Sequence, residues 1–290
     1  MGFKLANISG RASLVGEGNY YDLEFISNGE FNSNPSDALL NQDGLRRLNN
    51  QLDKMEPTGI INESEIGPPI TFPANCYAVG LNYKNHAEES GLEIPDVPMI
   101  FTKHTTCLVG PSAIIEMRSD AVDYEAELVA VIGKTGKDIE RDEAWDYVAG
   151  LCVGQDISDR GVQFSTKNLP QFNLGKSFDT FGPIGPFLIS PDELPNKDSL
   201  EIECLVNDEV RQKDNTSDLI FDIPFIISYL SEIVTLNIGD VIFTGTPGGV
   251  GVMEGKFLKE GDILTTRIEG LGNLRNECKR ISNRSLAKSD

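Results

Sequence analysis

Several residues and motifs that mark particular classes of protein are scarce in this sequence. The 290 residues include only 5 cysteines, which are far apart and form no CxxC motif, so we expect neither a disulfide framework nor a thiolate zinc site. No apolar run approaches the roughly 20 residues that a membrane-spanning helix needs. The N-terminal segment lacks the apolar core of a signal peptide, so we expect a cytoplasmic protein with no membrane partner.

Basic residues are also few. Lysine and arginine number 25 against 45 acidic residues, which leaves a net charge of -20. A chain this acidic repels nucleic acid and anionic membranes, so neither is expected as a partner. A small anionic substrate can still bind where a local group of cations or a bound metal reverses the field.

Three catalytic signatures are missing. The sequence has no GxSxG nucleophile elbow and no HExxH motif, which argues against covalent serine catalysis and zinc proteolysis. Gly133-Lys134-Thr135 ends like a P-loop, but Leu128 stands where the first glycine belongs, so nucleotide binding is not expected.

Residues 1–70 predict a small N-terminal α/β domain and its linker. Short alternating runs separated by Gly and Asn indicate a β element in the first thirty or so residues. Four apolar residues at helical spacing predict one amphipathic helix over about 37–55, capped by Ser36. These four are Leu45, Leu48, Leu52 and Met55. The Pro-, Gly- and acid-rich stretch that follows has no period and indicates a linker.

Residues 71–290 predict a catalytic domain that is mainly β, within the α+β class. Strand-like apolar runs recur at 76–79, 99–101, 128–132, 205–206 and 241–243. Asn207-Asp208 is a plausible tight hairpin turn. Only two helices are confidently expected, over 142–148 and from Asp222 onward, which argues against a doubly wound parallel sheet. The first should turn Trp145 and Val148 inward, and the second should bury Ile223, Ile226, Ile227, Leu230, Ile233 and Val234.

The stretch 123–132 joins three acidic residues to a β-branched apolar run that is typical of a strand. Strand alternation places Asp123, Glu125 and Glu127 on one face, about 7 Å apart. Ionised carboxylates at that spacing repel by about 2 kcal/mol at an effective dielectric of about 20, so burying them requires a cation, a shared proton or strong donors. Either Glu125 and Glu127 hold a hard divalent metal with Asp156 as a third ligand, or the acidic residues line a solvated strand edge.

Only two histidines occur. If residues 84–90 form a helical turn, His86 and Glu89 share a face, and a carboxylate that orients an imidazole makes a general base. The alternative is a surface histidine beside a chance acidic residue. His104 follows Lys103, which is the more interesting of the two because a lysine at a strand end can meet an anion.

Two further cations and one loop could bind an anion. Arg160 offers a planar fork for a carboxylate, and Lys176 lies in an apolar setting where a lysine is rarely only solvated. The glycine-rich segment 244–251 could present backbone N–H groups. A surface ion pair is the alternative for Arg160.

Taken in chain order, these segments resemble the fumarylacetoacetate hydrolase superfamily, in its acylpyruvase or hydrolase-domain-containing type. The matching segments are 77–89, 101–103, 123–133, 147–163, 174–186 and 244–251, within about residues 72–276. The resemblance implies a mixed β-roll catalytic domain, a homodimer and a Mg²⁺ or Mn²⁺ site.

The resemblance also assigns roles to residues. The family's metal ligands correspond to Glu125, Glu127 and Asp156, and its water-activating dyad corresponds to His86 and Glu89. The substrate-binding positions correspond to Lys103, Arg160, Gln163, Lys176 and Thr246, with Lys176 also expected to act in catalysis. Asp123 exceeds the family pattern and is expected behind the ligands or in solvent.

Two positions depart from the family pattern. Gly161 follows Arg160 where an acidic residue is frequent, and Asp159 replaces a small residue. Both departures leave the metal ligand in place and put the local ion pairing in doubt.

The residues and the resemblance together favour a metal-dependent hydrolase that cleaves a C–C bond in a small 1,3-diketo acid, such as an acylpyruvate or fumarylpyruvate. In this hypothesis the metal chelates the 2-oxo acid, His86 deprotonates a water, and Lys176 stabilises the negative charge that develops. One alternative is decarboxylation of a 2-oxo diacid such as oxaloacetate. Others are isomerisation, dehydration or hydrolysis of a sugar-derived 2-oxo acid, and a non-catalytic acidic binding module.

Overall fold

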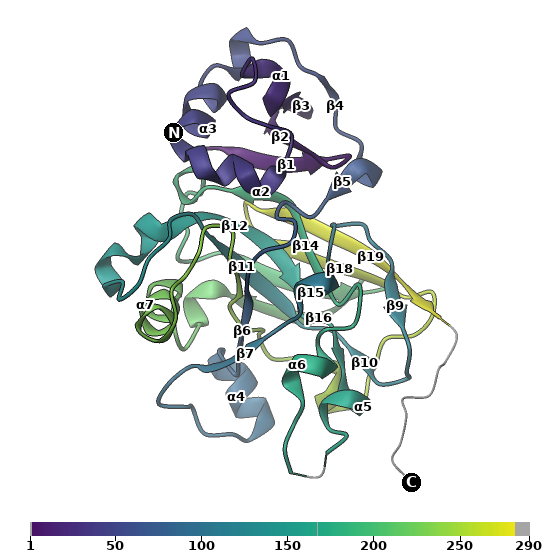
Figure 1. Ribbon diagram of the computed structural model, residues 1–290. Coiled ribbons are helices and arrows are strands. Elements are labelled where there is room, and N and C mark those ends of the chain that lie inside the picture. Colours follow the sequence, from purple (N-terminus) through teal and green to yellow (C-terminus); the bar gives the residue numbers. More distant parts are fainter. Residues whose placement is uncertain (1, 167, 282–290) are drawn as a thin grey trace.

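The computed structural model describes residues 2–166 and 168–281, and strands make up most of its regular structure (Figure 1). The largest sheet among these residues has 12 strands. Its main path runs through β4 (Gly59–Ile60), β3 (Asn19–Asp22), β2 (Arg11–Gly16), β1 (Lys4–Ile8), β14 (Gly182–Ile189), β12 (Val148–Gln155), β11 (Ala126–Ile132), β17 (Val241–Phe243), β6 (Cys76–Gly80) and β7 (Met99–Thr102). Beside this path, β5 (Ile66–Gly67) pairs with β1, and β8 (Leu108–Val109) pairs with β14. Most pairs are antiparallel, but β17 with β6 and β14 with β8 are parallel, so the sheet is mixed as expected.

A second sheet packs against the first. Its order is β16 (Glu209–Asn215), β15 (Glu201–Val206), β18 (Ile263–Ile268), β19 (Gly272–Arg280) and β9 (Ile115–Met117). The predicted hairpin between β15 and β16 is confirmed, and both turn residues, Asn207 and Asp208, adopt positive φ as such a turn requires. A short ladder joins β10 (Val122–Asp123) to β13 (Ser158–Asp159).

Strand β11 lies at the centre of the core. Leu128 and Ala130 belong to the apolar cluster shared with the second sheet, whereas Val129 and Val131 belong to the cluster that packs under the N-terminal helices. Both faces of this strand are therefore buried, which explains why its sequence is a continuous apolar run.

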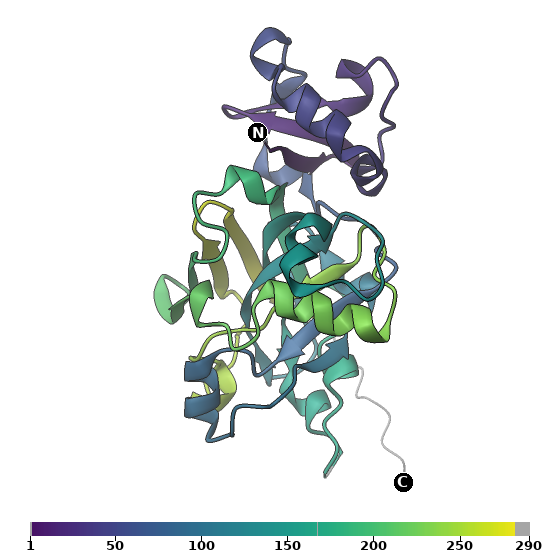
Figure 2. The same cartoon turned by 90° about the vertical axis from the view of Figure 1, so that its left-hand side faces the viewer.

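The first 70 residues form one end of the molecule, seen in purple in Figures 1 and 2. Their strand β1 pairs with β14 and so extends the large sheet. The single helix expected over about 37–55 is wrong: the chain forms α2 (Pro35–Ala38), a 3₁₀ turn (Leu39–Asn41), α3 (Gln42–Asn49) and another 3₁₀ turn (Leu52–Lys54). Asn34 rather than Ser36 caps α2, and the Asn41 side chain caps α3, which separates the two helices. Leu45, Leu48 and Leu52 are nevertheless buried, as predicted. The short α1 (Leu23–Ile26) precedes α2.

The main helix of the second segment is α7 (Ile223–Ile233), which starts where predicted, with Asp222 as its N-cap. Ile233, the last residue of the helix, is 64% exposed, contrary to expectation, whereas Leu230 and Ser231 of the same turn are buried. Residues Arg141–Tyr147 form a 3₁₀ helix rather than an α-helix, and Val148 is the first residue of β12. The remaining helices are α4 (Lys84–Ser90), α5 (Arg160–Gln163), α6 (Phe172–Gly175) and α8 (Gly251–Glu254).

All five cysteines are buried and unpaired, which confirms that no disulfide framework supports the described fold. Among the residues described, no helix combines the length and the apolar character needed to cross a bilayer.

Candidate metal and acid–base site

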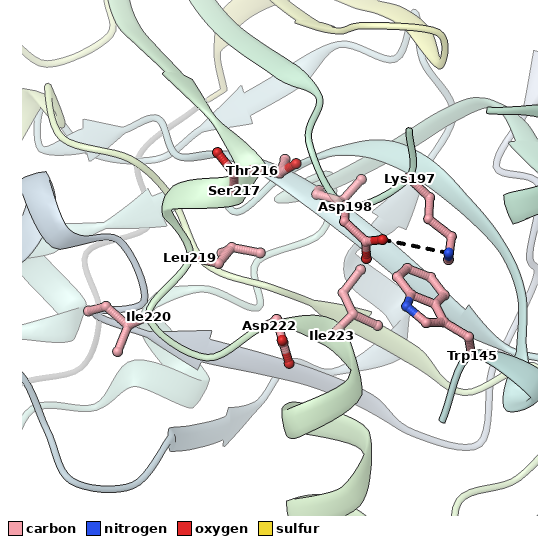
Figure 3. Close-up of a pocket in the computed structure, with 10 residues that line it drawn as sticks. Trp145, Lys197, Asp198, Thr216, Ser217, Leu219, Ile220, Asp222 and Ile223 are labelled. Atoms are coloured by element: carbon pink, nitrogen blue, oxygen red, sulfur yellow. Dashed lines mark ion pairs between the residues drawn. The ribbon is translucent and has the colours of Figure 1, made fainter. Parts of the chain in front are cut away.

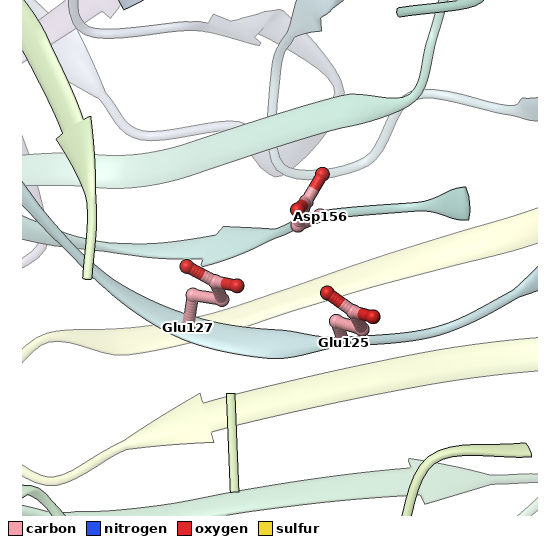
Figure 4. Close-up of side chains that lie close together, drawn as sticks. All are labelled: Glu125, Glu127 and Asp156. Carbon is pink, nitrogen blue, oxygen red and sulfur yellow. The ribbon is translucent and has the colours of Figure 1, made fainter. Parts of the chain in front are cut away.

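Glu125, Glu127 and Asp156 come together where β11 and β12 pair (Figure 4). The two strands are antiparallel with Ala126 opposite Gln155, so the residues just before β11 and just after β12 become neighbours. The N–H of Asp156 donates to the carbonyl of Glu125 at 2.9 Å. One oxygen from each of the three carboxylates lies within 4.8 Å of the others, and all three residues are buried.

Two lysines neutralise part of this buried charge. Lys176 Nζ donates to Glu125 Oε2 at 2.6 Å, to Asp156 Oδ2 at 2.7 Å and to Ser158 Oγ at 2.8 Å. Lys103 Nζ contacts Asp156 Oδ1 at 2.5 Å and also donates to the carbonyls of Lys176 and Phe181. All three N–H donors of each ammonium group are therefore hydrogen-bonded to the protein.

Arg160 links the carboxylates to Asp123. Its guanidinium donates to Asp123 Oδ2 at 2.8 Å, to Glu125 Oε1 at 2.6 Å and to Gln163 Oε1 at 2.8 Å. Asp123 is fully buried and also accepts the N–H groups of Gly251 and Val252. Of the two positions expected for Asp123, the structure shows the one behind the three converging carboxylates and not the one in solvent.

The charges of this cluster do not cancel. Four carboxylates, those of Asp123, Glu125, Glu127 and Asp156, face the three cations Lys103, Lys176 and Arg160, which leaves one negative charge. Burial alone would raise the pKa of Glu125, but Lys176 and Arg160 outweigh it and lower that pKa to about 2. Burial and the charges of Asp156 and Glu125 hold the pKa of Glu127 well above its ordinary value.

Glu127 is therefore the carboxylate that lacks a cation. Among the described residues its hydrogen-bond donor is the N–H of Gly245, at 2.7 Å from Oε2. A hard divalent ion fits this group, because three converging carboxylate oxygens are ligands that Mg²⁺ and Mn²⁺ prefer and the added charge relieves the repulsion. The residues that could hold Mg²⁺ or Mn²⁺ are thus Glu125, Glu127 and Asp156.

Helix α4 carries the predicted acid–base pair. His86 Nδ1 lies 2.7 Å from Glu89 Oε1, and Glu89 Oε2 accepts the N–H of Gly249 at 2.8 Å. Asn85 accepts the N–H of Gly248 at 3.0 Å and donates to Asp214 Oδ2 at 2.6 Å. The helix is thereby fixed to the glycine-rich segment and to β16, with Glu89 orienting the imidazole ring.

The glycine-rich segment does not offer its N–H groups to an external anion as expected. Those of Gly245, Gly249 and Gly251 bind the chain's own carboxylates at Glu127, Glu89 and Asp123, and the N–H of Val252, just after the segment, also binds Asp123. Gly249 has φ +97°, and a Cβ there would lie 2.1 Å from the carbonyl oxygen of Arg211. The segment therefore connects Glu127, a candidate metal ligand, to Glu89, the partner of His86.

A cavity of about 380 Å³ connects these groups. Of the predicted residues, it is lined by His86, Glu125, Glu127, Arg160, Gln163, Lys176 and Thr246. The oxygen of Gln163 accepts from Arg160, so its amide NH₂ stays available, and the Thr246 hydroxyl accepts from Gln212 at 2.8 Å and can still donate. These two side chains are the polar groups best placed to contact a ligand directly.

Lys103 departs from the role expected of it. It is 2% exposed, does not line the cavity and binds Asp156 from behind, so it positions a candidate metal ligand and is not placed to contact a ligand in the cavity. Sequence reasoning also missed Gln212 of β16, whose Oε1 accepts from Ala126 N at 2.9 Å and whose Nε2 holds Thr246. Gln212 lies in the polar segment EVRQKDN, and nothing in that sequence indicates that this one residue is buried.

Replacing Lys103 with Met should destabilise the protein by about 3–5 kcal/mol, because Asp156 and two carbonyl groups would lose their buried hydrogen-bond donor. Urea denaturation measures this loss. Lys213→Met is the matched control, since Lys213 is 64% exposed and lies 3.6 Å from Glu203, and it should change little. An unaltered unfolding midpoint for Lys103→Met would contradict the buried ion pair.

A second cavity, of about 270 Å³, lies elsewhere and contains none of the predicted site residues (Figure 3). Lys197 sits 4.8 Å over the ring of Trp145 and 3.6 Å from Asp198. Two of its polar residues have structural roles, since Thr216 accepts the N–H of Leu200 and Asp222 caps α7. We assign no chemistry to this cavity.

Comparison with known proteins places this site in context. A family model described as fumarylacetoacetate (FAA) hydrolase C-terminal matches residues 75–279. The fumarylacetoacetate hydrolase domain-containing protein 2 homolog of Dictyostelium discoideum is 44% identical over 232 residues, 76% of this chain and 75% of that protein. The mitochondrial oxaloacetate tautomerase of Xenopus laevis is 43% identical over 223 residues, 75% of this chain and 70% of that protein.

Solved structures share the whole fold. A Mycobacterium smegmatis protein superposes with a TM-score of 0.89 at 40% identity, covering 96% of this chain and 100% of that one. Maleylpyruvate hydrolase from Sphingobium sp. SYK-6, solved with manganese(II) ion and pyruvate, gives a TM-score of 0.80 at 26% identity, with 96% and 100% covered. These names include a tautomerase and a hydrolase, so the comparisons identify a family of enzymes without fixing the reaction. From the extent of the family match and the identity to these relatives, we conclude that the chain belongs to the fumarylacetoacetate hydrolase superfamily.

Proposed function

We propose that this protein catalyses proton transfer at C3 of a small 2-oxo acid with the help of Mg²⁺ or Mn²⁺, and that keto–enol tautomerisation of oxaloacetate is its first activity. The observation that carries the proposal is that His86 lines the same cavity as Glu125 and Glu127. A base and a carboxylate group suited to a metal therefore face one ligand. The names of relatives above 40% identity support oxaloacetate, and the manganese and pyruvate bound to the Sphingobium enzyme support the ligand class.

A divalent cation bound by the three carboxylates would polarise the 2-oxo carbonyl and make the hydrogens at C3 more acidic. Glu89 accepts the Nδ1 proton of His86, which leaves Nε2 as the base that exchanges a proton with C3. In the enol-to-keto direction the O–H bond of the C2 hydroxyl breaks, a C–H bond forms at C3, and the double bond moves from C2=C3 to C2=O, so no atom is gained or lost. Gln163 and Thr246 donate to the substrate oxygens and set its orientation, and Lys176 keeps Glu125 and Asp156 in place.

Hydrolysis of an acylpyruvate is the second candidate, and the size of the cavity favours it, because 380 Å³ leaves room beyond a four-carbon diacid. Here His86 would deprotonate a water that adds to the C4 carbonyl. The C3–C4 bond then breaks, C3 takes up a proton, and pyruvate and a carboxylic acid are released. Decarboxylation of oxaloacetate would use the same polarised carbonyl without an activated water.

Three assays with Mg²⁺ or Mn²⁺ distinguish these reactions. Loss of the enol absorbance of oxaloacetate follows tautomerisation, release of CO₂ follows decarboxylation, and loss of the diketo absorbance of acetylpyruvate follows hydrolysis. We expect metal-dependent acceleration of the first. Cleavage of acetylpyruvate without acceleration of the enol-to-keto exchange would favour the second candidate, and inactivity in all three assays would contradict both.

We also propose a homodimer in the cytoplasm, as the sequence led us to expect. Several relatives carry the word mitochondrial in their names. Light scattering in solution tests the dimer, with a mass near twice 31.8 kDa expected and the monomer mass contradicting it.

A further inference from the structure

The cavity has two chemically different halves. The inner half holds the carboxylates, Arg160, Lys176 and His86. The walls farther out are apolar and come from five separate parts of the chain: β7, the segment after α4, the segment after α5, α6 and α8. These apolar residues include Leu92, Met99, Phe101, Phe164, Phe172 and Met253.

A pair of aromatic rings marks the direction from the inner half to the outer half. Lys176 Nζ, which binds Glu125 and Asp156, lies 5.4 Å from the ring centre of Phe101. The ring of Phe101 is stacked on that of Phe172 at 5.5 Å between centroids, with 30° between the planes. A ligand anchored by its 2-oxo acid group at the carboxylates therefore extends along these two rings.

The outer half offers no partner for a second charge. Among the described residues that line the cavity, the permanent cations are Arg160 and Lys176, and both belong to the inner half. Lys176 uses all three of its donors on Glu125, Asp156 and Ser158, and Arg160 binds Asp123, Glu125 and Gln163. Moving a carboxylate from water to an apolar wall without a partner is costly, whereas moving a hydrocarbon chain there is favourable.

Leu92, Met99, Phe164 and Met253 are exposed although they are large and apolar. Single exposed apolar residues are ordinary, but these four come from different segments and converge on one cavity mouth. A substrate tail that covers them would remove this apolar surface from water.

We propose that the outer half binds an uncharged hydrocarbon tail attached to the 2-oxo acid, with Phe101 and Phe172 as the residues that select it. This inference rests on the proposed function for the anchoring of the 2-oxo acid end and adds the class of the other end. The preferred ligands beyond oxaloacetate are 2-oxo acids and acylpyruvates with an unbranched aliphatic chain, and a carboxylate at the far end of a chain longer than that of oxaloacetate weakens binding.

Calorimetric titration of the Mn²⁺-loaded protein with saturated 2-oxo acids tests the inference without any turnover. We expect affinity to rise about fourfold with each CH₂ from pyruvate through 2-oxobutanoate and 2-oxopentanoate to 2-oxohexanoate. The diacid 2-oxoglutarate should bind more weakly than 2-oxopentanoate, which has the same carbon chain. Equal affinities along the series, or tighter binding of the diacid, would overturn the proposal.

Phe172→Ala should lower the affinity for 2-oxohexanoate at least fivefold more than it lowers the affinity for pyruvate. Phe25→Ala is the matched control, because Phe25 is 78% exposed on α1 and does not line the cavity, and it should leave the whole series unchanged. A loss that is equal for pyruvate and 2-oxohexanoate would also overturn the tail site.

The two proposals fail in different ways. Metal-dependent binding of pyruvate without any effect of chain length refutes the tail site and leaves the proposed function standing. Binding that depends on chain length in a protein without tautomerase or hydrolase activity supports the tail site and refutes the proposed function. Failure of every 2-oxo acid to bind refutes both.

Discussion

Replacing His86 with Ala should lower turnover of the substrate by about 10²- to 10⁴-fold and leave Mn²⁺ affinity nearly unchanged. The imidazole is held by Glu89 and lines the cavity, but it does not belong to the candidate metal-ligand group, which consists of three carboxylates. Its loss therefore removes the proton carrier without removing a ligand. Steady-state kinetics at saturating Mn²⁺ measures the effect with oxaloacetate or with acetylpyruvate.

The chain contains its own control, because it has only one other histidine. His104 is exposed and does not line the cavity, so His104→Ala should retain normal turnover. Wild-type turnover in His86→Ala, or an equal loss in both variants, would show that His86 is not the base.

Replacing Glu127 with Gln should abolish the stabilisation that Mn²⁺ gives the folded protein. At a Mn²⁺ concentration about 100 times its Kd, the wild type should gain about 2.7 kcal/mol, which is roughly 5 to 10 °C in Tm for a chain of this size. The amide keeps the shape of the carboxylate and can still accept the N–H of Gly245, but it loses the charge that binds the ion.

The same variant should be at least as stable as the wild type without metal. The pKa of Glu127 is raised in the folded protein, so its ionisation costs stability as the pH rises above the value of an unfolded carboxyl. Gln carries no such cost at neutral pH. Thermal unfolding with Mn²⁺ and with a chelator measures both effects, and the exposed Glu260→Gln should behave as wild type. A normal Mn²⁺ shift in Glu127→Gln would remove this residue from the ligand set.

The convergence of the two glutamates on one side of the chain could be predicted because it depends on local geometry. Residues two apart in a strand-like segment lie on one side, so Glu125 and Glu127 were expected to act together. Asp156, the third carboxylate, follows β12, the strand that pairs with β11. On α4, a spacing of three residues brings His86 to Glu89. Short-range periodicity was sufficient for the Glu125–Glu127 and His86–Glu89 pairs, whereas Asp156 reaches the glutamates through the pairing of β11 with β12.

The position of Lys103 could not be predicted, because it depends on contacts between distant segments. Its partners are Asp156 and the carbonyls of Lys176 and Phe181, between 53 and 78 residues away along the chain. The glycine-rich segment was expected to bind an anion, and it does, but the anions are side chains of the same protein. No pattern in the sequence distinguishes an internal carboxylate from a bound ligand.

The helix expected over about 37–55 illustrates a third limit. Its apolar spacing correctly identified the buried face, but the side chain of Asn41 accepts the N–H of Gly44 and starts a new helix there. A polar residue that can cap a helix competes with continuation of the helix, and the hydrophobic period does not record that competition.

The most direct test of the central claim is an electron paramagnetic resonance titration of the protein with Mn²⁺, with and without pyruvate, which measures the free ion. The account predicts one Mn²⁺ per chain, tighter binding when pyruvate is present, and loss of the site in Glu127→Gln but not in Glu260→Gln. Absence of tight Mn²⁺ binding to the wild type would contradict a metal and 2-oxo acid site at Glu125, Glu127 and Asp156. So would Mn²⁺ binding that persists in Glu127→Gln and whose affinity does not change with pyruvate.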